Sequence, residues 1–269
     1  MTVVEITRPV VLTIAGFDPS GGAGVIADVR TIESLHCTAV AAITSVTFQN
    51  ADRFFGAFHQ PAESVVGQVE AILGTTKIAA VKIGMLPTAE IVYDVARLIQ
   101  GNNLPAPVID PVLESTTGGK LMSDDAFEAF VTSLLPLARL VTPNVPEAEQ
   151  LAGINIPGED EMRQAAARIR ELGAPAVLIK GGHLNQKSAI RTQKSEEERR
   201  EAVDLLDDDG HITVLKGAWI AGGNLRGTGC MLSSAIAAGL ATGKSLVEAI
   251  QQAKAFVAEA LQNETQLHP

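Results

Sequence analysis

The sequence predicts a three-layer α/β/α protein in which helices cover both faces of a central, mostly parallel sheet. Short apolar runs rich in β-branched residues alternate with longer segments of helical periodicity, the pattern of strand–helix–strand units. Runs such as Val177-Leu178-Ile179 contain no polar residue, as expected of strands buried on both faces. Polar clusters follow several of these runs, where the functional residues of parallel sheets collect.

The composition favours one globular domain and excludes several classes of protein. Of the 269 residues, 46% are hydrophobic, and because neither a repeat nor a linker divides the chain, we expect residues 1–269 to form one domain. The net charge of −10 argues against a nucleic-acid partner. No segment has the roughly 20 apolar residues of a membrane span, and no leader peptide is evident. Two cysteines without a disulfide framework predict a cytoplasmic protein.

The first half of the chain alternates strands with helices. Residues 10–15 form an apolar run that ends at Gly16, which predicts a buried strand. A glycine-rich segment, 17–24, then precedes a helix over 25–35. The same pattern predicts strands over 39–46, 79–83 and 107–110, and helices over 62–73, 88–99 and 124–134.

The second half adds strands over 137–142 and 176–180 and a helix over 159–172. Residues 184–202 break the alternation with a charged run, which predicts a solvated insertion or, alternatively, a lid. Residues 203–206 and 212–215 predict an antiparallel hairpin. Segment 238–245 fits the phosphate-binding-loop pattern, but no strand precedes it, so Ser245 and Glu248 are expected to cap the last helix.

Residues 227–230, Gly-Thr-Gly-Cys, run directly into a helix of small apolar residues. The two glycines let backbone approach a ligand closely, and the free N–H groups of a helix start carry partial positive charge. This combination predicts a seat for phosphate. Cys230, at the helix opening, is expected to have a lowered pKa and to act as a base or nucleophile. The alternative is a small core-filling residue.

The glycine-rich segment after the first strand is predicted to bring backbone close to a small ligand. Segment 22–27, Gly-Ala-Gly-Val-Ile-Ala, also fits a relaxed dinucleotide fingerprint. No acidic residue ends the next strand to hold a ribose, so a nicotinamide cofactor is not favoured.

Seven motifs occur in one order along the chain: 15–24 with Asp28, 46–50 (Val-Thr-Phe-Gln-Asn), 82–85 (Lys-Ile-Gly-Met), 110–112 (Asp-Pro-Val), 142–144 (Thr-Pro-Asn) with Glu147, 180–183 (Lys-Gly-Gly-His) and 227–230. Together they resemble the hydroxymethylpyrimidine/phosphomethylpyrimidine kinases of thiamine biosynthesis, which have a ribokinase-like fold. The resemblance runs from Val11 to about Val257. It implies phosphorylation of 4-amino-5-hydroxymethyl-2-methylpyrimidine and then of its monophosphate, with ATP, Mg²⁺ and a homodimeric state.

The resemblance also implies roles for individual residues. Gly227, Thr228 and Gly229 would form an anion hole, and Cys230 would be the base. Lys180 would bind the ATP phosphates. Asn144, Thr228 and Arg226 would also lie at the ATP site. Asp110 and Glu147 would bind magnesium. The substrate would be bound by Gly16, Ala23, Asp28, Gln49, Met85 and Val112.

Structural roles stay open for several of these residues. Asp28 could be a solvated helix residue, Met85 ordinary core packing, and Gln49 a partner of loop backbone. Asp110 and Glu147 could cap the helices that follow them.

The sequence departs from the family pattern at three places. Asn224-Leu225-Arg226 replaces Asn-Thr-His, the segment 113–118 lacks a basic residue, and Ile26 replaces a glutamine. Arg226 is expected either to neutralise phosphate charge or to be a surface arginine.

Two other functions remain open from the sequence. A pyridoxal kinase would also act on a flat heteroaromatic ring that bears a hydroxymethyl group. A non-catalytic sensor of the pyrimidine would bind it without releasing ADP.

Overall fold

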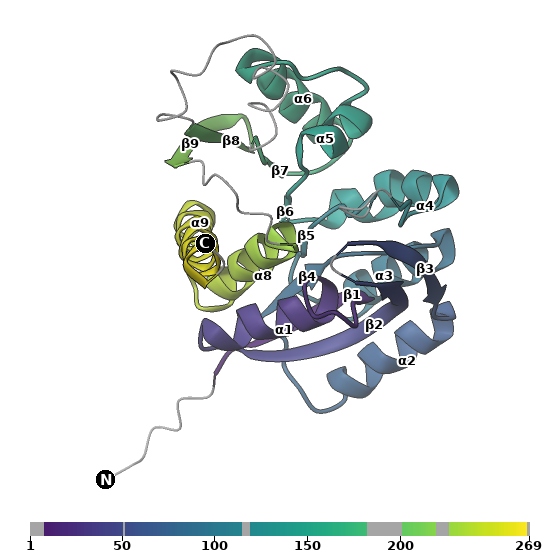
Figure 1. Cartoon of the computed structure of the whole chain (residues 1–269). Coiled ribbons are helices and arrows are strands. Elements are labelled where there is room, and N and C mark those ends of the chain that lie inside the picture. Colours follow the sequence, from purple (N-terminus) through teal and green to yellow (C-terminus); the bar gives the residue numbers. More distant parts are fainter. Residues whose placement is uncertain (1–7, 51, 115–118, 182–200, 219–225, 268–269) are drawn as a thin grey trace.

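The computed structural model describes residues 8–50, 52–114, 119–181, 201–218 and 226–267 of the chain (Figure 1). Within them, nine strands form one sheet in the order β3-β2-β1-β4-β5-β6-β7-β8-β9. The six strands from β2 to β7 in this order are parallel, whereas β3, β8 and β9 are antiparallel to their neighbours. The strands are β1 (Val10–Phe17), β2 (Thr38–Gln49), β3 (Phe54–His59), β4 (Ala80–Ile83), β5 (Val108–Ile109), β6 (Leu140–Val141), β7 (Ala176–Ile179), β8 (Glu201–Asp208) and β9 (His211–Ala218).

The helices divide between the two faces of this sheet, so the predicted three-layer arrangement is confirmed (Figure 1). One core lies under α2 to α6, and the other lies under α1, α8 and α9. Neighbouring strand residues such as Val11 and Leu12 belong to opposite cores because successive strand side chains alternate in direction. The helices are α1 (Gly24–Ser34), α2 (Ala62–Leu73), α3 (Ala89–Gly101), α4 (Asp124–Ala129), α5 (Val145–Ala152), α6 (Glu159–Glu171), α8 (Thr228–Ala241) and α9 (Leu246–Leu267).

Two elements were not predicted from the sequence. β3 is an edge strand whose Phe55 and Phe58 are both 61% exposed, so it lacks the burial that produces a readable alternation. α5 has eight residues, which is too short for a clear helical period. The expected helix over 124–134 is α4 followed by a π-helical turn, Phe130–Leu134, and a short 3₁₀ turn.

The end of α8 confirms that segment 238–245 is not a phosphate-binding loop. Gly243 has φ +83° just after the helix, the left-handed conformation that commonly ends helices. Ser245 Oγ accepts from the backbone N–H of Glu248 at 3.3 Å, and the Glu248 carboxylate accepts from the Ser245 N–H at 2.9 Å. This reciprocal cap starts α9, as predicted.

One expectation cannot be compared with the structure, and one is confirmed. Nearly all of the charged insertion over 184–202 lies beyond the described residues. The predicted hairpin is present as β8 and β9 and is longer than expected at both ends. None of the helices in the described part of the chain has both the length and the apolar character of a membrane span.

Two helical glycines give a test of the packing. No atom lies within 4 Å of where a Cβ on Gly67 in α2 would be, so Gly67→Ala should stabilise the protein by about 0.5–1 kcal/mol through helix propensity. A Cβ on Gly239 in α8 would lie 2.8 Å from the Cβ of Ala249 in α9. Gly239→Ala should therefore destabilise by about 1–3 kcal/mol in urea unfolding. A stabilised Gly239→Ala protein would contradict the close contact of α8 with α9.

Candidate active site

The carboxyl ends of the parallel strands and the start of α8 bring charged groups together. Asp110 follows β5 and Lys180 follows β7, and Lys180 Nζ donates to Asp110 Oδ1 at 2.9 Å. The Cys230 thiol, in the first turn of α8, lies close enough to Asp110 for the two groups to influence one another's pKa. These three predicted site residues, 120 positions apart along the chain at most, therefore meet at one point.

Glycines make this approach possible. A Cβ on Gly229 would lie 3.1 Å from Lys180 Nζ and 3.4 Å from Asp110 Oδ2, so a side chain there would crowd both groups. Gly227 has φ +76°, and a Cβ on it would lie 2.1 Å from the carbonyl oxygen of Gly22. The start of α8 is therefore seated directly on the glycine-rich loop that follows β1.

The N-terminus of α8 has the properties of an anion seat. Its N-cap residue is Gly227, and no side chain among the described residues caps it. The N–H groups of the first turn, at Thr228, Gly229 and Cys230, are therefore left for a ligand. Lys180 beside them adds a positive charge. Backbone donors and a cation at one point suit a phosphate group.

The expectation that Cys230 has a lowered pKa is wrong. Burial raises the pKa of the thiol to about 12, and the carboxylates of Asp110 and Asp28 act in the same direction. The attraction of Lys82 is too weak to offset them. A helix start lowers a thiol pKa only where the thiolate is adequately solvated. Cys230 is therefore protonated at neutral pH.

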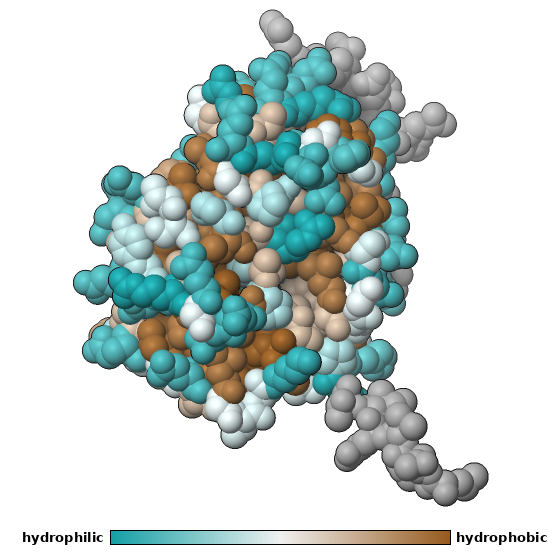
Figure 2. All heavy atoms as spheres, turned by 180° about the vertical axis from the view of Figure 1, so that it is seen from behind, coloured by the Kyte–Doolittle hydropathy of each residue, from teal (hydrophilic) through white to brown (hydrophobic). Residues whose placement is uncertain are grey.

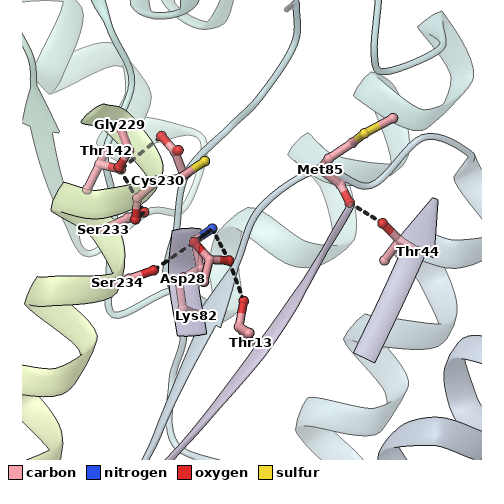
Figure 3. Close-up of polar contacts among 11 residues, drawn as sticks. Thr13, Asp28, Thr44, Lys82, Met85, Thr142, Gly229, Cys230, Ser233 and Ser234 are labelled. Carbon is pink, nitrogen blue, oxygen red and sulfur yellow. Dashed lines mark hydrogen bonds and ion pairs between the residues drawn. The ribbon is translucent and has the colours of Figure 1, made fainter. Parts of the chain in front are cut away.

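Asp28 has neither of the two roles expected from the sequence, which were substrate binding and a solvated position on a helix. It is fully buried in α1, and its carboxylate accepts from three side chains of the protein (Figure 3). Lys82 Nζ donates at 2.8 and 2.9 Å, Thr13 Oγ1 at 2.6 Å and Ser234 Oγ at 2.8 Å. With its oxygens engaged in this way, Asp28 is an internal ion-pair partner instead of a substrate contact or a solvated residue.

Lys82 is the functional-site residue that sequence reasoning undervalued. It is fully buried, and although burial opposes its charge, Asp28 together with Cys230 and Asp110 outweighs this effect and holds the pKa of Lys82 above its usual value. Cys230 and Asp110 also act on this pKa, which places the ammonium group behind the site. The sequence does contain a signal for this role, because a lysine inside an apolar strand requires a buried partner of opposite charge.

Glu147 and Asn144 form a capping box at the start of α5. Asn144 Oδ1 accepts from the Glu147 N–H at 2.9 Å, and Glu147 Oε2 accepts from the Asn144 N–H at 2.8 Å. The capping alternative for Glu147 is thus confirmed. Burial raises the pKa of Glu147 to about 7, with Lys180 lowering it and Asp110 raising it. Glu147 therefore lies within electrostatic reach of the Asp110–Lys180 pair.

The expected substrate-binding residues surround the glycine-rich loop at several points. Met85 is buried, and a Cβ on Gly16 would lie 2.9 Å from its sulfur. The Met85 carbonyl accepts from Thr44 Oγ1 at 2.7 Å, and Figure 3 shows this contact apart from the Asp28 group. Ala23 Cα would be 3.1 Å from a Cβ on Gly227, whereas Val112 follows Asp110 and is half-buried.

Gln49 and Arg226 contact one another. Arg226 Nη2 donates to Gln49 Oε1 at 2.7 Å, and Nη1 donates to the carbonyl oxygen of Asn50. The guanidinium group also lies 3.8 Å from Asp18 Oδ2, and the side chain is only 14% exposed. Arg226 is therefore not a surface arginine.

Comparison with known proteins gives consistent matches. The family model described as phosphomethylpyrimidine kinase matches residues 18–269. A hydroxymethylpyrimidine/phosphomethylpyrimidine kinase of Streptomyces coelicolor is 40% identical over 256 residues, which are 95% of this chain and 90% of that protein. The crystal structure of a phosphomethylpyrimidine kinase of Clostridium difficile is similar with a TM-score of 0.79 and 35% identity, covering 94% of this chain and 100% of that one.

A pyridoxal kinase is also similar in structure. The Staphylococcus aureus pyridoxal kinase, solved with AMP-PCP and pyridoxal, gives a TM-score of 0.83 and 33% identity over 96% of this chain and 89% of that one. The predicted ribokinase-like fold is therefore confirmed.

The Lys82–Asp28 pair should dominate the response of stability to mutation. Asp28→Ala or Lys82→Met leaves an unpaired buried charge and should cost about 3–5 kcal/mol in urea unfolding. The double variant Asp28→Leu/Lys82→Met should lose less stability than the two single variants together, because no buried charge remains. Arg97→Ala, which breaks an exposed pair with Asp94, is the control and should cost at most about 1 kcal/mol. A loss below about 1 kcal/mol for Lys82→Met would refute the assigned burial.

The raised pKa of Cys230 predicts slow alkylation of the ligand-free protein. With a thiol pKa of about 12, its labelling by iodoacetamide at pH 8 should be on the order of 10³-fold slower than that of free cysteine. Its rate should still rise between pH 8 and pH 10, since the thiolate fraction grows with pH. Intact-mass spectrometry, with Cys230→Ser to exclude labelling of Cys37, measures this rate. A rate that levels off below pH 8 would contradict the raised pKa.

Proposed function

The chain belongs to the phosphomethylpyrimidine kinase family, and from this premise we propose that it phosphorylates 4-amino-5-hydroxymethyl-2-methylpyrimidine and then its monophosphate with ATP. It is a phosphotransferase of thiamine biosynthesis. The observation that carries this proposal is the uncapped start of α8 beside Lys180 and Asp110. Helix N–H groups and an ammonium group at one point match the charge of a phosphoryl group in transfer.

Phosphoryl transfer has a loose transition state, so positioning and charge neutralisation supply most of the catalysis. We assign the backbone N–H groups of Thr228, Gly229 and Cys230 to the oxygens of the transferred group. Lys180 is assigned to the ATP phosphates. Its hydrogen bond to Asp110 holds the ammonium group at the seat before a phosphate arrives.

Asp110 and Glu147 fit a magnesium site. Both are buried carboxyl groups, and repulsion from Asp110 helps to raise the pKa of Glu147 to about 7, a strain that a bound cation would relieve. Magnesium is usually held by one or two carboxylates together with phosphate oxygens and water. When bound, it would neutralise charge on the ATP phosphates. Asn144 orients Glu147 through the capping box.

We assign Cys230 to the proton of the substrate hydroxyl group. Because the thiol is protonated at neutral pH, it can take that proton only as its own proton passes to a neighbouring acceptor, such as an oxygen of the bound phosphates. In a loose transition state the hydroxyl proton leaves late, so a thiolate formed in advance is not required.

Pyridoxal phosphorylation is the second candidate activity. It is favoured by the similarity to the Staphylococcus aureus enzyme solved with pyridoxal. Pyridoxal and the pyrimidine are both flat heteroaromatic rings that carry a hydroxymethyl group. The third alternative, a sensor, would bind the pyrimidine without releasing ADP.

We further propose a cytoplasmic homodimer. Phe48 of β2 and Phe58 of β3 lie on the same face of the sheet edge and are 53% and 61% exposed. Figure 2 shows the back of the molecule, where hydrophobic residues form patches between hydrophilic ones. Light scattering during size-exclusion chromatography would measure the assembly.

The products of the reaction test the proposed function. We expect mass spectrometry to find both mono- and diphosphate after incubation of the pyrimidine alcohol with ATP and Mg²⁺. Parallel reactions with pyridoxal should be slower. Lys180→Met should lower turnover by roughly 10²-fold or more, because a charge at the phosphoryl seat is lost. Efficient pyridoxal phosphorylation with an unchanged pyrimidine would overturn the proposal.

A further inference from the structure

Arg226 joins three segments that are far apart in the sequence. It directly precedes the start of α8, and its guanidinium group reaches Gln49 and Asn50 at the end of β2. On its other side lies Asp18, in the loop after β1. The arginine stem also packs on this loop, since a Cβ on Gly22 would lie 3.5 Å from Arg226 Cβ.

This contact decides which way the Gln49 amide faces. A guanidinium group can only donate hydrogen bonds, so the atom that receives Nη2 at 2.7 Å must be the amide oxygen. The amide NH₂ group is then directed away from Arg226, and no acceptor for it is found among the described residues. The oxygen keeps a second lone pair. Gln49 thus presents a donor beside a partly free acceptor.

The surroundings hold Arg226 in place but leave two buried atoms without a hydrogen-bond partner. Asp18 Oδ1 accepts from the backbone N–H and the hydroxyl group of Ser20, at 2.9 and 2.7 Å, which fixes the carboxylate. Asp18 Oδ2 and Arg226 Nε are buried and make no hydrogen bond. A buried polar atom without a hydrogen-bond partner is costly, so the Arg226 side chain is kept in this position by its contacts to Gln49 and Asn50 and by the charge of Asp18.

We propose that Arg226 is the residue that sets substrate specificity by orienting Gln49, a role that rests on the proposed binding of the substrate ring by Gln49. The oriented amide matches a ring nitrogen with an adjacent amino group, because its NH₂ donates to the nitrogen and its oxygen accepts from the amino group. The pyrimidine alcohol has this edge. Pyridoxal has no amino group, so the oriented amide selects against it.

A double-mutant cycle tests this coupling. Calorimetry measures the affinity of the wild-type protein, Arg226→Ala, Gln49→Ala and the double variant for the pyrimidine alcohol and for ADP. Arg226→Ala should weaken pyrimidine binding about 10-fold, the loss expected for one hydrogen bond, and leave ADP binding within about 2-fold. Once Gln49 is alanine, removing Arg226 should have little further effect. In Arg226→Ala, the preference for the pyrimidine alcohol over pyridoxal should fall along with the pyrimidine affinity.

Two further variants separate positioning from charge and folding. Arg226→Lys keeps the positive charge and one contact but cannot contact Gln49 and Asn50 at the same time, so it should recover only part of the pyrimidine affinity. Arg30→Ala removes an arginine that contacts the same loop, at the carbonyl oxygen of Gly21, without touching Gln49. It should change neither affinity. Circular dichroism checks that each variant is folded.

Three outcomes would overturn the inference. Additive effects in the cycle would show that Arg226 does not act through Gln49. A loss of ADP affinity with pyrimidine affinity unchanged would make Arg226 a phosphate contact. If the wild-type protein binds only pyridoxal, the proposed function fails separately, and the same cycle is run with pyridoxal; additivity there would then overturn the role of Arg226.

Discussion

The ion pair between Lys82 and Asp28 is the interaction on which the site depends. A buried lysine and a buried aspartate are each costly alone, so the pair requires its elements to be fully assembled. Lys82 belongs to β4, Asp28 to α1, and their partners Thr13 and Ser234 belong to β1 and α8 (Figure 3). The start of α8, with Cys230 and its uncapped first turn, is therefore held against the sheet.

Asp110, Lys180 and Glu147 add charges of alternating sign next to this pair. As a result, the two carboxyl groups, Asp110 and Glu147, have different pKa values. Lys180 and then Lys82 outweigh the effect of burial on Asp110 and hold its pKa below the usual value. Glu147 is also buried, and burial together with repulsion from Asp110 outweighs the attraction of Lys180, so its pKa rises to about 7. Two carboxyl groups beside one lysine thus differ in protonation. This difference supports the proposed binding of a cation together with a phosphate.

Close backbone contacts give the site its shape. The glycine-rich loop after β1 and the Gly-Thr-Gly turn touch directly, because a Cβ on Gly227 would lie 2.1 Å from Gly22 O. Likewise, a Cβ on Gly24, which has φ +60°, would lie 2.2 Å from Gly16 O. Arg226 and Gln49 then connect the same region to the end of β2. The residues proposed to bind the substrate and those proposed to bind phosphate are therefore in direct contact with one another.

The sequence by itself determined the layered fold, the parallel strands and the glycine turn at α8. Strand and helix periods are local properties of the chain, and a glycine turn before an apolar helix is visible in a few residues. β3 and α5 were missed because an exposed edge strand and an eight-residue helix carry little of this periodic signal.

Tertiary structure alone decided the electrostatics of the site. Asp28 meets Lys82 from 54 positions away, and Arg226 meets Gln49 from 177 positions away. The pKa of Cys230 is raised, contrary to expectation, because desolvation depends on what packs around the thiol and outweighs the local effect of the helix start. Partners and burial come from the assembled chain, and they set the charge that each residue carries.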